Sequence, residues 1–125
     1  MLIKMLKGKI HRATVTDANL DYMGSLSLDE DLMDSAGLNE YEKIQVLNIT
    51  NGNRLETYII KGERGSGKVC INGAAAHLVH KGDLVIIVSY CQLSNEESKY
   101  HQPQIVYVNA DNQVLSKSTD EHVLV

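Results

Sequence analysis

In the pair Gly24-Ser25, a serine hydroxyl lies next to the peptide bond that joins the two residues. The serine side chain could therefore attack this bond. A serine hydroxyl is a weak nucleophile, but a carbonyl group fixed beside it raises its effective concentration. Glycine carries no side chain to block such an attack and tolerates the strain that would help it. A Gly-Ser pair alone is typical of an ordinary turn, so its meaning depends on the motifs around it.

Four motifs with polar residues and small residues follow one another along the chain: Leu6-Lys7-Gly8-Lys9-Ile10-His11-Arg12, Tyr22-x-Gly24-Ser25, Thr50-Asn51-Gly52-x-Arg54 and Asn72-Gly73-Ala74-Ala75-Ala76-His77. In this order, they closely resemble the aspartate 1-decarboxylase family, whose pyruvoyl-dependent members make β-alanine. The resemblance runs from about Met5 to about Asp111, which is nearly the whole domain. One departure is visible, because an aromatic residue is common in the family where this chain has Leu47.

The resemblance implies that the chain is a zymogen that cleaves itself between Gly24 and Ser25, giving fragments 1–24 and 25–125. The Ser25 hydroxyl would attack the Gly24 carbonyl to form an ester, and elimination would leave a dehydroalanine that hydrolyses to a pyruvoyl group. Such a cofactor is needed because decarboxylation leaves electrons that no ordinary side chain accepts. The amine of L-aspartate would form a Schiff base with this group. The β-alanine product would supply pantothenate and coenzyme A synthesis.

The same resemblance implies roles for further residues. Tyr58 would donate the proton that the product carbon needs, a role that suits a phenol poised by its surroundings. Residues implied to contact the substrate are Thr57, Gly73, Ala74 and Ala75, with Arg54 and Lys9 as anchors for its carboxylates. His11, Asn72 and Tyr22 are expected to contact these residues and not the substrate itself. No metal is implied, and His77 and His80 have no evident third ligand nearby.

Taken one at a time, several of these residues have simpler interpretations. Tyr58 could be a packing aromatic on a strand, and Arg54 and Lys9 could be exposed charges like most of their kind. Lys9 and His11 share a polar strand face, which is usually solvated. The run Gly73–Ala76 is also a good helix start. Small residues at that point would let a carboxylate approach free backbone N–H groups.

Composition places the chain among single-domain globular proteins. Its 125 residues can form one core, which must be aliphatic because the sequence has no Trp and no Phe. The net charge of −4 disfavours a nucleic-acid partner. The N-terminal segment lacks a signal-peptide core, and no apolar run is long enough to span a membrane. Two cysteines, Cys70 and Cys91, are expected to be free thiols in a reducing cytoplasm.

Local patterns predict the main elements. Leu2–Val15 reads as a strand, and Asp83–Tyr90, the most hydrophobic run, as the central buried strand. Asp29 is a suitable N-cap for a helix over 30–36 that ends at Gly37. A second short helix follows the capping box that begins at Ser94.

A hairpin is predicted around Asn51-Gly52, between strands Lys43–Ile49 and Arg54–Ile60. A two-residue loop would pair Arg54 with Ile49. The alternation of a strand then puts Arg54 and Tyr58 on one face and Thr57 on the other. The two neighbours can serve one site only through a bulge, a barrel rim or a neighbouring subunit, and the pattern leaves this choice open.

About six short strands with brief helices predict a mainly β, barrel-like domain. The resemblance makes it a six-stranded double-psi β-barrel over residues 1–110, assembled as a homotetramer. Residues 111–125 are polar and aperiodic, so we expect a poorly ordered tail.

Other functions remain open at this point. The nearest alternative is a pyruvoyl-dependent decarboxylase of another small amino acid, although Arg54 and Lys9 favour a dicarboxylic substrate. A non-catalytic barrel that serves as a binding module would have no use for Gly24-Ser25 together with Tyr58. Whether maturation needs a helper protein is not decided by the residues.

Overall fold

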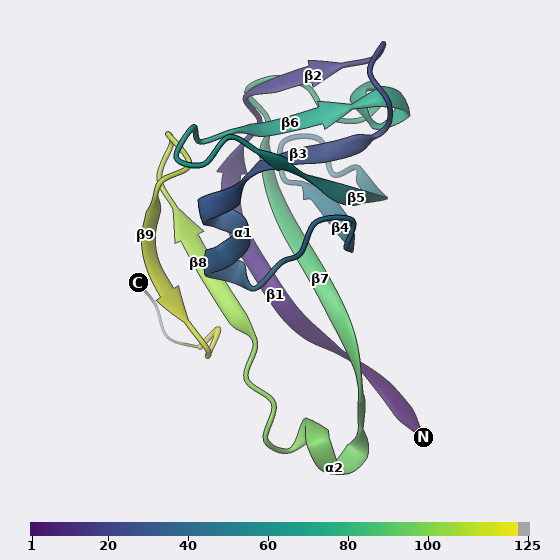
Figure 1. Cartoon of the computed structure of the whole chain (residues 1–125), viewed down its shortest axis with the longest axis vertical. Coiled ribbons are helices and arrows are strands. Elements are labelled where there is room, and N and C mark those ends of the chain that lie inside the picture. Colours follow the sequence, from purple (N-terminus) through teal and green to yellow (C-terminus); the bar gives the residue numbers. More distant parts are fainter. Residues whose placement is uncertain (123–125) are drawn as a thin grey trace.

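The computed structural model describes residues 1–122 (Figure 1). These residues form nine strands, two α-helices and one 3₁₀-helix. The strands are β1 (Leu2–Thr14), β2 (Asp17–Asn19), β3 (Ser25–Asp29), β4 (Lys43–Asn48), β5 (Arg54–Gly62), β6 (Val69–Asn72), β7 (Leu84–Ser94), β8 (Gln104–Val108) and β9 (Val114–Ser118). The helices are α1 (Glu30–Ala36), η1 (Gly73–His77) and α2 (Asn95–Ser98). The predicted mainly β class with short helices is confirmed.

The nine strands belong to one sheet with the order β2-β6-β3-β5-β4-β7-β1-β8-β9. In Figure 1 the strands turn from nearly horizontal in β2, β6 and β3 to oblique in β1 and steep in β7. The sheet therefore curves around one aliphatic core, which is consistent with a compact barrel. The core includes the fully buried side chains Ile10, Leu26, Ile59, Ile71 and Ile87. More than six strands are present because short strands such as β2, which lack hydrophobic alternation, add to the sheet.

β1 and β7 form the longest antiparallel pair, from Leu2 opposite Ser94 to Thr14 opposite Leu84. β7 also pairs with β4, so the predicted central position of the 83–90 run is confirmed. The far ends of β1 and β7 extend beyond the other strands as a two-stranded arm, with α2 at its tip (Figure 1). The predicted capping box is present there, because Ser94 and Glu97 each bond the backbone N–H of the other.

Helix α1 has the predicted bounds and caps. The Asp29 carboxylate accepts a hydrogen bond from the Asp31 N–H, and Gly37 ends the helix in the left-handed conformation. The helix packs so closely on β1 that a Cβ atom at Gly8 would overlap the Ala36 carbonyl oxygen. Glycine at position 8 is therefore a requirement of this contact.

The β4–β5 hairpin differs from its prediction in register. Arg54 pairs with Leu47, not with Ile49, because the loop is longer than two residues. The Asn48 N–H donates to the Asn53 carbonyl oxygen, which leaves four residues in the turn. The side-chain amides of Asn51 and Asn53 both donate to the carbonyl oxygen of Leu78. This anchor, more than twenty residues away along the chain, holds the loop in its wider form.

The segment after Asp111 also differs from its prediction as a poorly ordered tail. Val114–Ser118 forms β9, which pairs antiparallel with β8. Asn112 is buried, and its side chain bonds the backbone of Thr14 and Gly67. Main-chain pairing and this amide hold the segment, so it carries no hydrophobic periodicity that a sequence pattern could detect. The predicted tail's last three residues, 123–125, lie outside the described residues.

Candidate active site

Ser25 is the first residue of β3 and lies between two neighbouring strands. It pairs with Asn72 of β6, and its side chain is completely buried. The parallel pairing of β3 with β5 begins at Leu26 opposite Ile59, so the preceding residues, Ser25 and Tyr58, lie side by side. Leu26 and Ile59 face the core. Ser25, Asn72 and Tyr58 therefore share the opposite face of the sheet, which we call the outer face.

Asn72 connects Ser25 to two other polar side chains. Its Nδ2 donates to the Ser25 Oγ at 3.3 Å and to the Ser27 Oγ at 3.0 Å. The Cys70 thiol donates in turn to the Asn72 Oδ1 at 3.3 Å. Burial raises the pKa of Cys70, with a smaller contribution from the charge of Asp17. The thiol therefore keeps its proton at neutral pH and can act as the donor.

Gly73 makes room for the backbone of Gly24. Its φ is +70°, and a Cβ atom at this position would lie 2.7 Å from the Gly24 Cα and 2.8 Å from the Gly24 nitrogen. A Cβ atom at Gly24 itself would meet nothing within 4 Å. The packing therefore requires glycine at position 73, whereas a side chain at position 24 would meet no neighbouring atom within 4 Å.

Strand β6 holds the chain on both sides of the Gly24-Ser25 bond. β2 pairs with it in parallel on one edge, from Asp17 opposite Cys70 to Asn19 opposite Asn72. β3 pairs with it antiparallel on the other edge, from Ser25 opposite Asn72. The segment 20–24 that joins β2 to β3 is exposed. The two flanks are thus fixed while the connection between them is accessible.

Thr57 and Tyr58 lie on opposite faces of β5, as predicted. Thr57 pairs with the buried residue Ile44, and Tyr58 pairs with the exposed residue Lys43. The Tyr58 side chain is 38% exposed on the outer face. Arg54 is an even number of residues from Tyr58 on the same strand, so it also lies on the outer face. Tyr58 is therefore the member of the Thr57-Tyr58 pair that shares a face with Ser25.

Lys9 and Arg54, the predicted anchors for carboxylates, form no hydrogen bond or ion pair with Ser25 among the described residues. Lys9 lies on β1, four strands from β3 in the sheet order. Its ammonium group is 2.9 Å from the carboxylate of Glu121. Arg54 is four residues before Tyr58, which is about 13 Å along a strand. It is exposed at the start of β5.

His11 lies two residues beyond Lys9 on β1, against the ring of Tyr107. The two ring centroids are 5.8 Å apart in an edge-to-face arrangement. Burial lowers the pKa of His11, and the positive charges of Lys9 and Arg12 lower it further. The imidazole is therefore neutral at neutral pH. Its Nδ1 is buried without a hydrogen-bond partner among the described residues.

The remaining predicted residues surround the turn from β6 into η1. Ala74 is exposed and Ala75 is half-buried, and both belong to η1. The helix start predicted here is a 3₁₀ turn that ends at His77. The side chain of Tyr22 is exposed, and its carbonyl oxygen would lie 3.1 Å from a Cβ atom at Gly73. Tyr22 therefore meets the site through its backbone.

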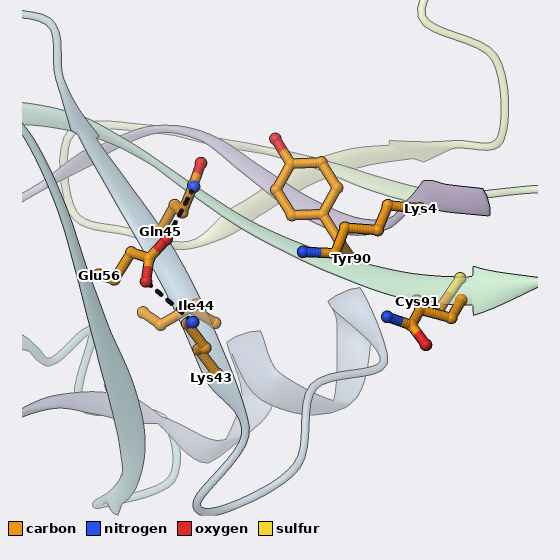
Figure 2. Close-up of a pocket in the computed structure, with 8 residues that line it drawn as sticks. Lys4, Lys43, Ile44, Gln45, Glu56, Tyr90 and Cys91 are labelled. Carbon is orange, nitrogen blue, oxygen red and sulfur yellow. Dashed lines mark hydrogen bonds and ion pairs between the residues drawn. The ribbon is translucent and has the colours of Figure 1, made fainter. Parts of the chain in front are cut away.

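A cavity of about 210 Å³ lies on strands β4, β5, β7 and β1 (Figure 2). Its walls include Lys43, the cross-strand partner of Tyr58, and Glu56. The Glu56 carboxylate binds the Lys43 ammonium at 2.9 Å and accepts a hydrogen bond from Gln45 at 3.4 Å. The predicted site residues do not line this cavity, so we assign it no part in the chemistry at Ser25.

Three residues that contact the site were not singled out by their sequence pattern. Ser27 and Cys70 bond Asn72, and Glu121 binds Lys9. Ser25-x-Ser27 and Cys70-x-Asn72 both alternate with the period of a strand, which is the signal that could have identified the first two. Glu121 has no comparable signal.

Two other features concern the described residues as a whole. Within residues 1–122, no three His, Cys, Asp or Glu side chains gather as they would to hold a metal ion. None of the helices in this part of the chain has the length and apolar character that crossing a membrane requires.

Comparison with known proteins gives a consistent result. The family model described as aspartate decarboxylase matches residues 1–115. An aspartate 1-decarboxylase of Caldicellulosiruptor saccharolyticus is 60% identical over 121 residues, which cover 97% of this chain and 94% of that protein. The enzyme of the same name from Acetivibrio thermocellus is 57% identical over 98% of both chains. That of Corynebacterium efficiens is 56% identical over 96% of this chain and 88% of its own. The chain therefore belongs to the aspartate decarboxylase family.

Proposed function

We propose that this protein decarboxylates L-aspartate to β-alanine and carbon dioxide, using a pyruvoyl group that it makes from Ser25. The β-alanine would serve pantothenate and coenzyme A synthesis. Membership of the family and the printed activity of its relatives support this activity. The observation that carries the cofactor assignment is the position of Ser25. It is completely buried, its hydroxyl accepts a hydrogen bond from Asn72, and it directly follows the exposed residue Gly24.

Self-cleavage begins with the Ser25 Oγ forming a bond to the Gly24 carbonyl carbon. The peptide C–N bond breaks, and the hydroxyl proton ends on the Ser25 nitrogen, which leaves an ester. Loss of the Ser25 Cα proton then breaks the Cβ–Oγ bond, so that Gly24 leaves as a carboxylate and residue 25 becomes dehydroalanine. Water replaces the nitrogen, which departs as ammonia. Fragment 25–125 then begins with a pyruvoyl group.

The surroundings of residue 25 fit a pyruvoyl group better than a free amino terminus. A simple hydrolysis would leave an ammonium group at a fully buried position. Burying a charge without a partner of opposite charge is strongly unfavourable. A pyruvoyl group is neutral, so it avoids burying a charge at this position. The pyruvoyl group supplies the electron sink for decarboxylation.

The chain's own residues would bind the substrate and supply a proton. We assign proton donation to Tyr58, because it lies beside Ser25 on the outer face and its side chain is partly exposed. Gly73, Ala74, Ala75 and Thr57 would contact the substrate. The cations of Lys9 and Arg54 would hold its carboxylates, since charge-assisted hydrogen bonds to carboxylates are strong. Neither cation contacts Ser25 among the described residues of one chain, so a second copy would complete the site, in a homotetramer.

Mass spectrometry of the denatured protein tests the self-cleavage. We expect fragments 1–24 and 25–125, with the larger one lighter by one ammonia than a chain that begins with serine. Ser25→Ala should fold but remain one chain, since it has no hydroxyl to attack. Incubation of the cleaved protein with aspartate should release β-alanine. An active protein that remains intact at 125 residues would exclude a pyruvoyl group made from Ser25.

A further inference from the structure

Cys70 and Ser27 lie opposite each other in the β3–β6 ladder, two residues along each strand from the pair Ser25 and Asn72. These four polar side chains therefore form a square on the outer face of two paired strands. Asn72 and Cys70 are buried, and Ser25 is completely buried. Asn72 is the member that contacts the other three.

The orientation of the Asn72 amide decides what Ser25 can do. As the structure has it, Nδ2 donates to Ser25 and Ser27, and Oδ1 faces the Cys70 thiol. The reverse orientation would satisfy the serines equally well, because a hydroxyl can either donate or accept. It would place the amide N–H against sulfur, which is a weak acceptor. The thiol is therefore the one neighbour that distinguishes the two orientations.

We propose that Cys70 is a positioning residue for self-cleavage, which fixes the Asn72 amide with its N–H directed at the Ser25 oxygen. This inference rests on the proposed function and concerns the rate at which the cofactor forms. Burial keeps the Cys70 thiol protonated, so its S–H remains available as the donor to Asn72.

The orientation matters at both bond-breaking steps. As Ser25 loses its proton and attacks Gly24, an N–H directed at Oγ stabilises the negative charge that develops there. When the Cβ–Oγ bond later breaks, the same N–H stabilises the oxygen that leaves in the Gly24 carboxylate. In the reverse orientation, the Ser25 proton would be donated to the Asn72 carbonyl oxygen. An amide oxygen is too weak a base to accept that proton, so the hydroxyl would be held in an unreactive state.

The first test compares cleavage rates of freshly purified full-length variants by denaturing mass spectrometry. Cys70→Val and Cys70→Ala remove the donor, and we expect cleavage to slow about tenfold, as the loss of one hydrogen bond predicts. Cys70→Ser restores a donor and should cleave within about threefold of the unchanged chain. Cys91→Ala is the matched control, because Cys91 lies on β7 and its thiol bonds the Met5 carbonyl oxygen. It should cleave at the unchanged rate.

A general loss of packing would give a different pattern. Cys70→Val fills most of the thiol's space, so thermal unfolding should show it to be at least as stable as Cys70→Ser. Slow cleavage in a stable Cys70→Val, together with rescue by serine, supports positioning. Wild-type cleavage rates in folded Cys70→Val, or failure of Cys70→Ser to rescue, would overturn it. If the unchanged chain does not cleave at all, the proposed function fails as well.

A second measurement leaves Cys70 in place. In Ser25→Ala/Cys91→Ala protein, which stays uncleaved, Cys70 is the only thiol, and its S–H stretch can be read by infrared spectroscopy. We expect the band at lower frequency than that of a thiol in an apolar solvent, because the S–H donates to Asn72. A band at the frequency of a free thiol would overturn the inference even if every Cys70 variant failed to fold.

Discussion

Tyr58 has the exposure and the position expected of a proton donor rather than of a packing aromatic. It lies beside Ser25, and its ring is not covered by the core. We predict that Tyr58→Phe cleaves normally but turns over aspartate about 10²–10⁴-fold more slowly, the usual effect of losing a positioned acid. Tyr90→Phe is the matched control, since Tyr90 is exposed on β7 and should retain full activity. Steady-state kinetics on fully cleaved protein provide the measurement. Full activity in Tyr58→Phe would leave the proton to another donor, such as bound water.

Substitution of Arg54 should affect substrate binding, because binding is its assigned role. Arg54→Ala removes a charge-assisted contact to a carboxylate, which is worth about 1.5–3 kcal/mol. If that contact is equally strong in the ground state and the transition state, the loss appears mainly as a higher KM. Arg54→Lys should recover only part of it, because an ammonium group lacks the planar fork of a guanidinium. Arg64→Ala is the control, since Arg64 binds Asp31 and Asp34 beside α1. An unchanged KM in Arg54→Ala would remove Arg54 from the site.

The turn from β6 into η1 imposes a steric limit on the segment that carries the cleavage site. Gly73→Ala would place a Cβ atom against the Gly24 backbone and force alanine to a φ of +70°. We predict a marked loss of cleavage and of stability. Gly52→Ala isolates the backbone strain, because its φ is +79° but a Cβ atom there meets nothing within 4 Å.

The control should lose about 1–2 kcal/mol of unfolding free energy, the usual cost of the left-handed conformation, and should cleave normally. Denaturant unfolding and mass spectrometry measure the two effects separately. Cleavage of Gly73→Ala at the rate of Gly52→Ala would show that the 20–24 segment tolerates displacement.

The pairing of β1 implies that the two fragments stay together after cleavage. Fragment 1–24 contains β1, which lies between β7 and β8 in the sheet; Ile10 of β1 and Val15, which directly follows it, are completely or almost completely buried. Each such side chain contributes roughly 1.5–3 kcal/mol by leaving water. We predict that native mass spectrometry of cleaved protein shows both fragments in one particle, and that denaturant is needed to separate them. Loss of fragment 1–24 during gel filtration would contradict this.

Elements whose determinants are local could be predicted from the sequence, and those with distant determinants could not. Helix α1 agrees with its prediction at both ends because Asp29 and Gly37 act on adjacent residues. The predicted register of the β4–β5 hairpin was wrong because the loop is anchored to Leu78, outside the hairpin. The sequence pattern did not predict strand β9, because main-chain pairing with β8 holds this strand and such pairing leaves no hydrophobic pattern in the sequence.

The site shows the same division. Glycine and serine at the cleavage site, and the alternation of Thr57 and Tyr58, could be read from adjacent residues. The pairing of Ser25 with Asn72 could not, because it joins strands far apart in the sequence. The hydrogen bonds of Asn72 to Ser27 and Cys70 depend on that register, so no pattern within either strand alone would have revealed them.

At the scale of the whole molecule, the predicted site residues of one chain belong to two sets of strands. Ser25, Asn72, Gly73 and Tyr58 gather where β3, β5 and β6 meet. Lys9 and His11 lie on β1, on the other side of β4 and β7 in the sheet. A substrate held at both its amine and its carboxylates would need both groups. A second copy of the chain can supply the missing group, since symmetric assemblies bring different surfaces of identical chains together.

Mixed assemblies test whether the two groups come from different chains. Ser25→Ala lacks the cofactor and Lys9→Ala lacks the anchor, so neither should be fully active alone. If Lys9 acts on the Ser25 of a neighbouring copy, co-assembly at equal amounts should restore about one quarter of the sites. The two chains must be produced together with different tags, and the doubly tagged particles must be isolated before the assay.

Ser25→Ala mixed with Tyr58→Phe is the matched control for this experiment. The structure places Ser25 and Tyr58 on adjacent strands of the same chain. A site assembled from these two variants would lack either the cofactor or the proton donor, so mixing should add no activity beyond that of the parents. Recovery with Lys9→Ala but not with Tyr58→Phe would support a site completed across a subunit boundary. If neither mixture recovers activity in confirmed mixed particles, Lys9 must act within its own chain. The curved sheet would then have to bring β1 to β3 without help from a second copy.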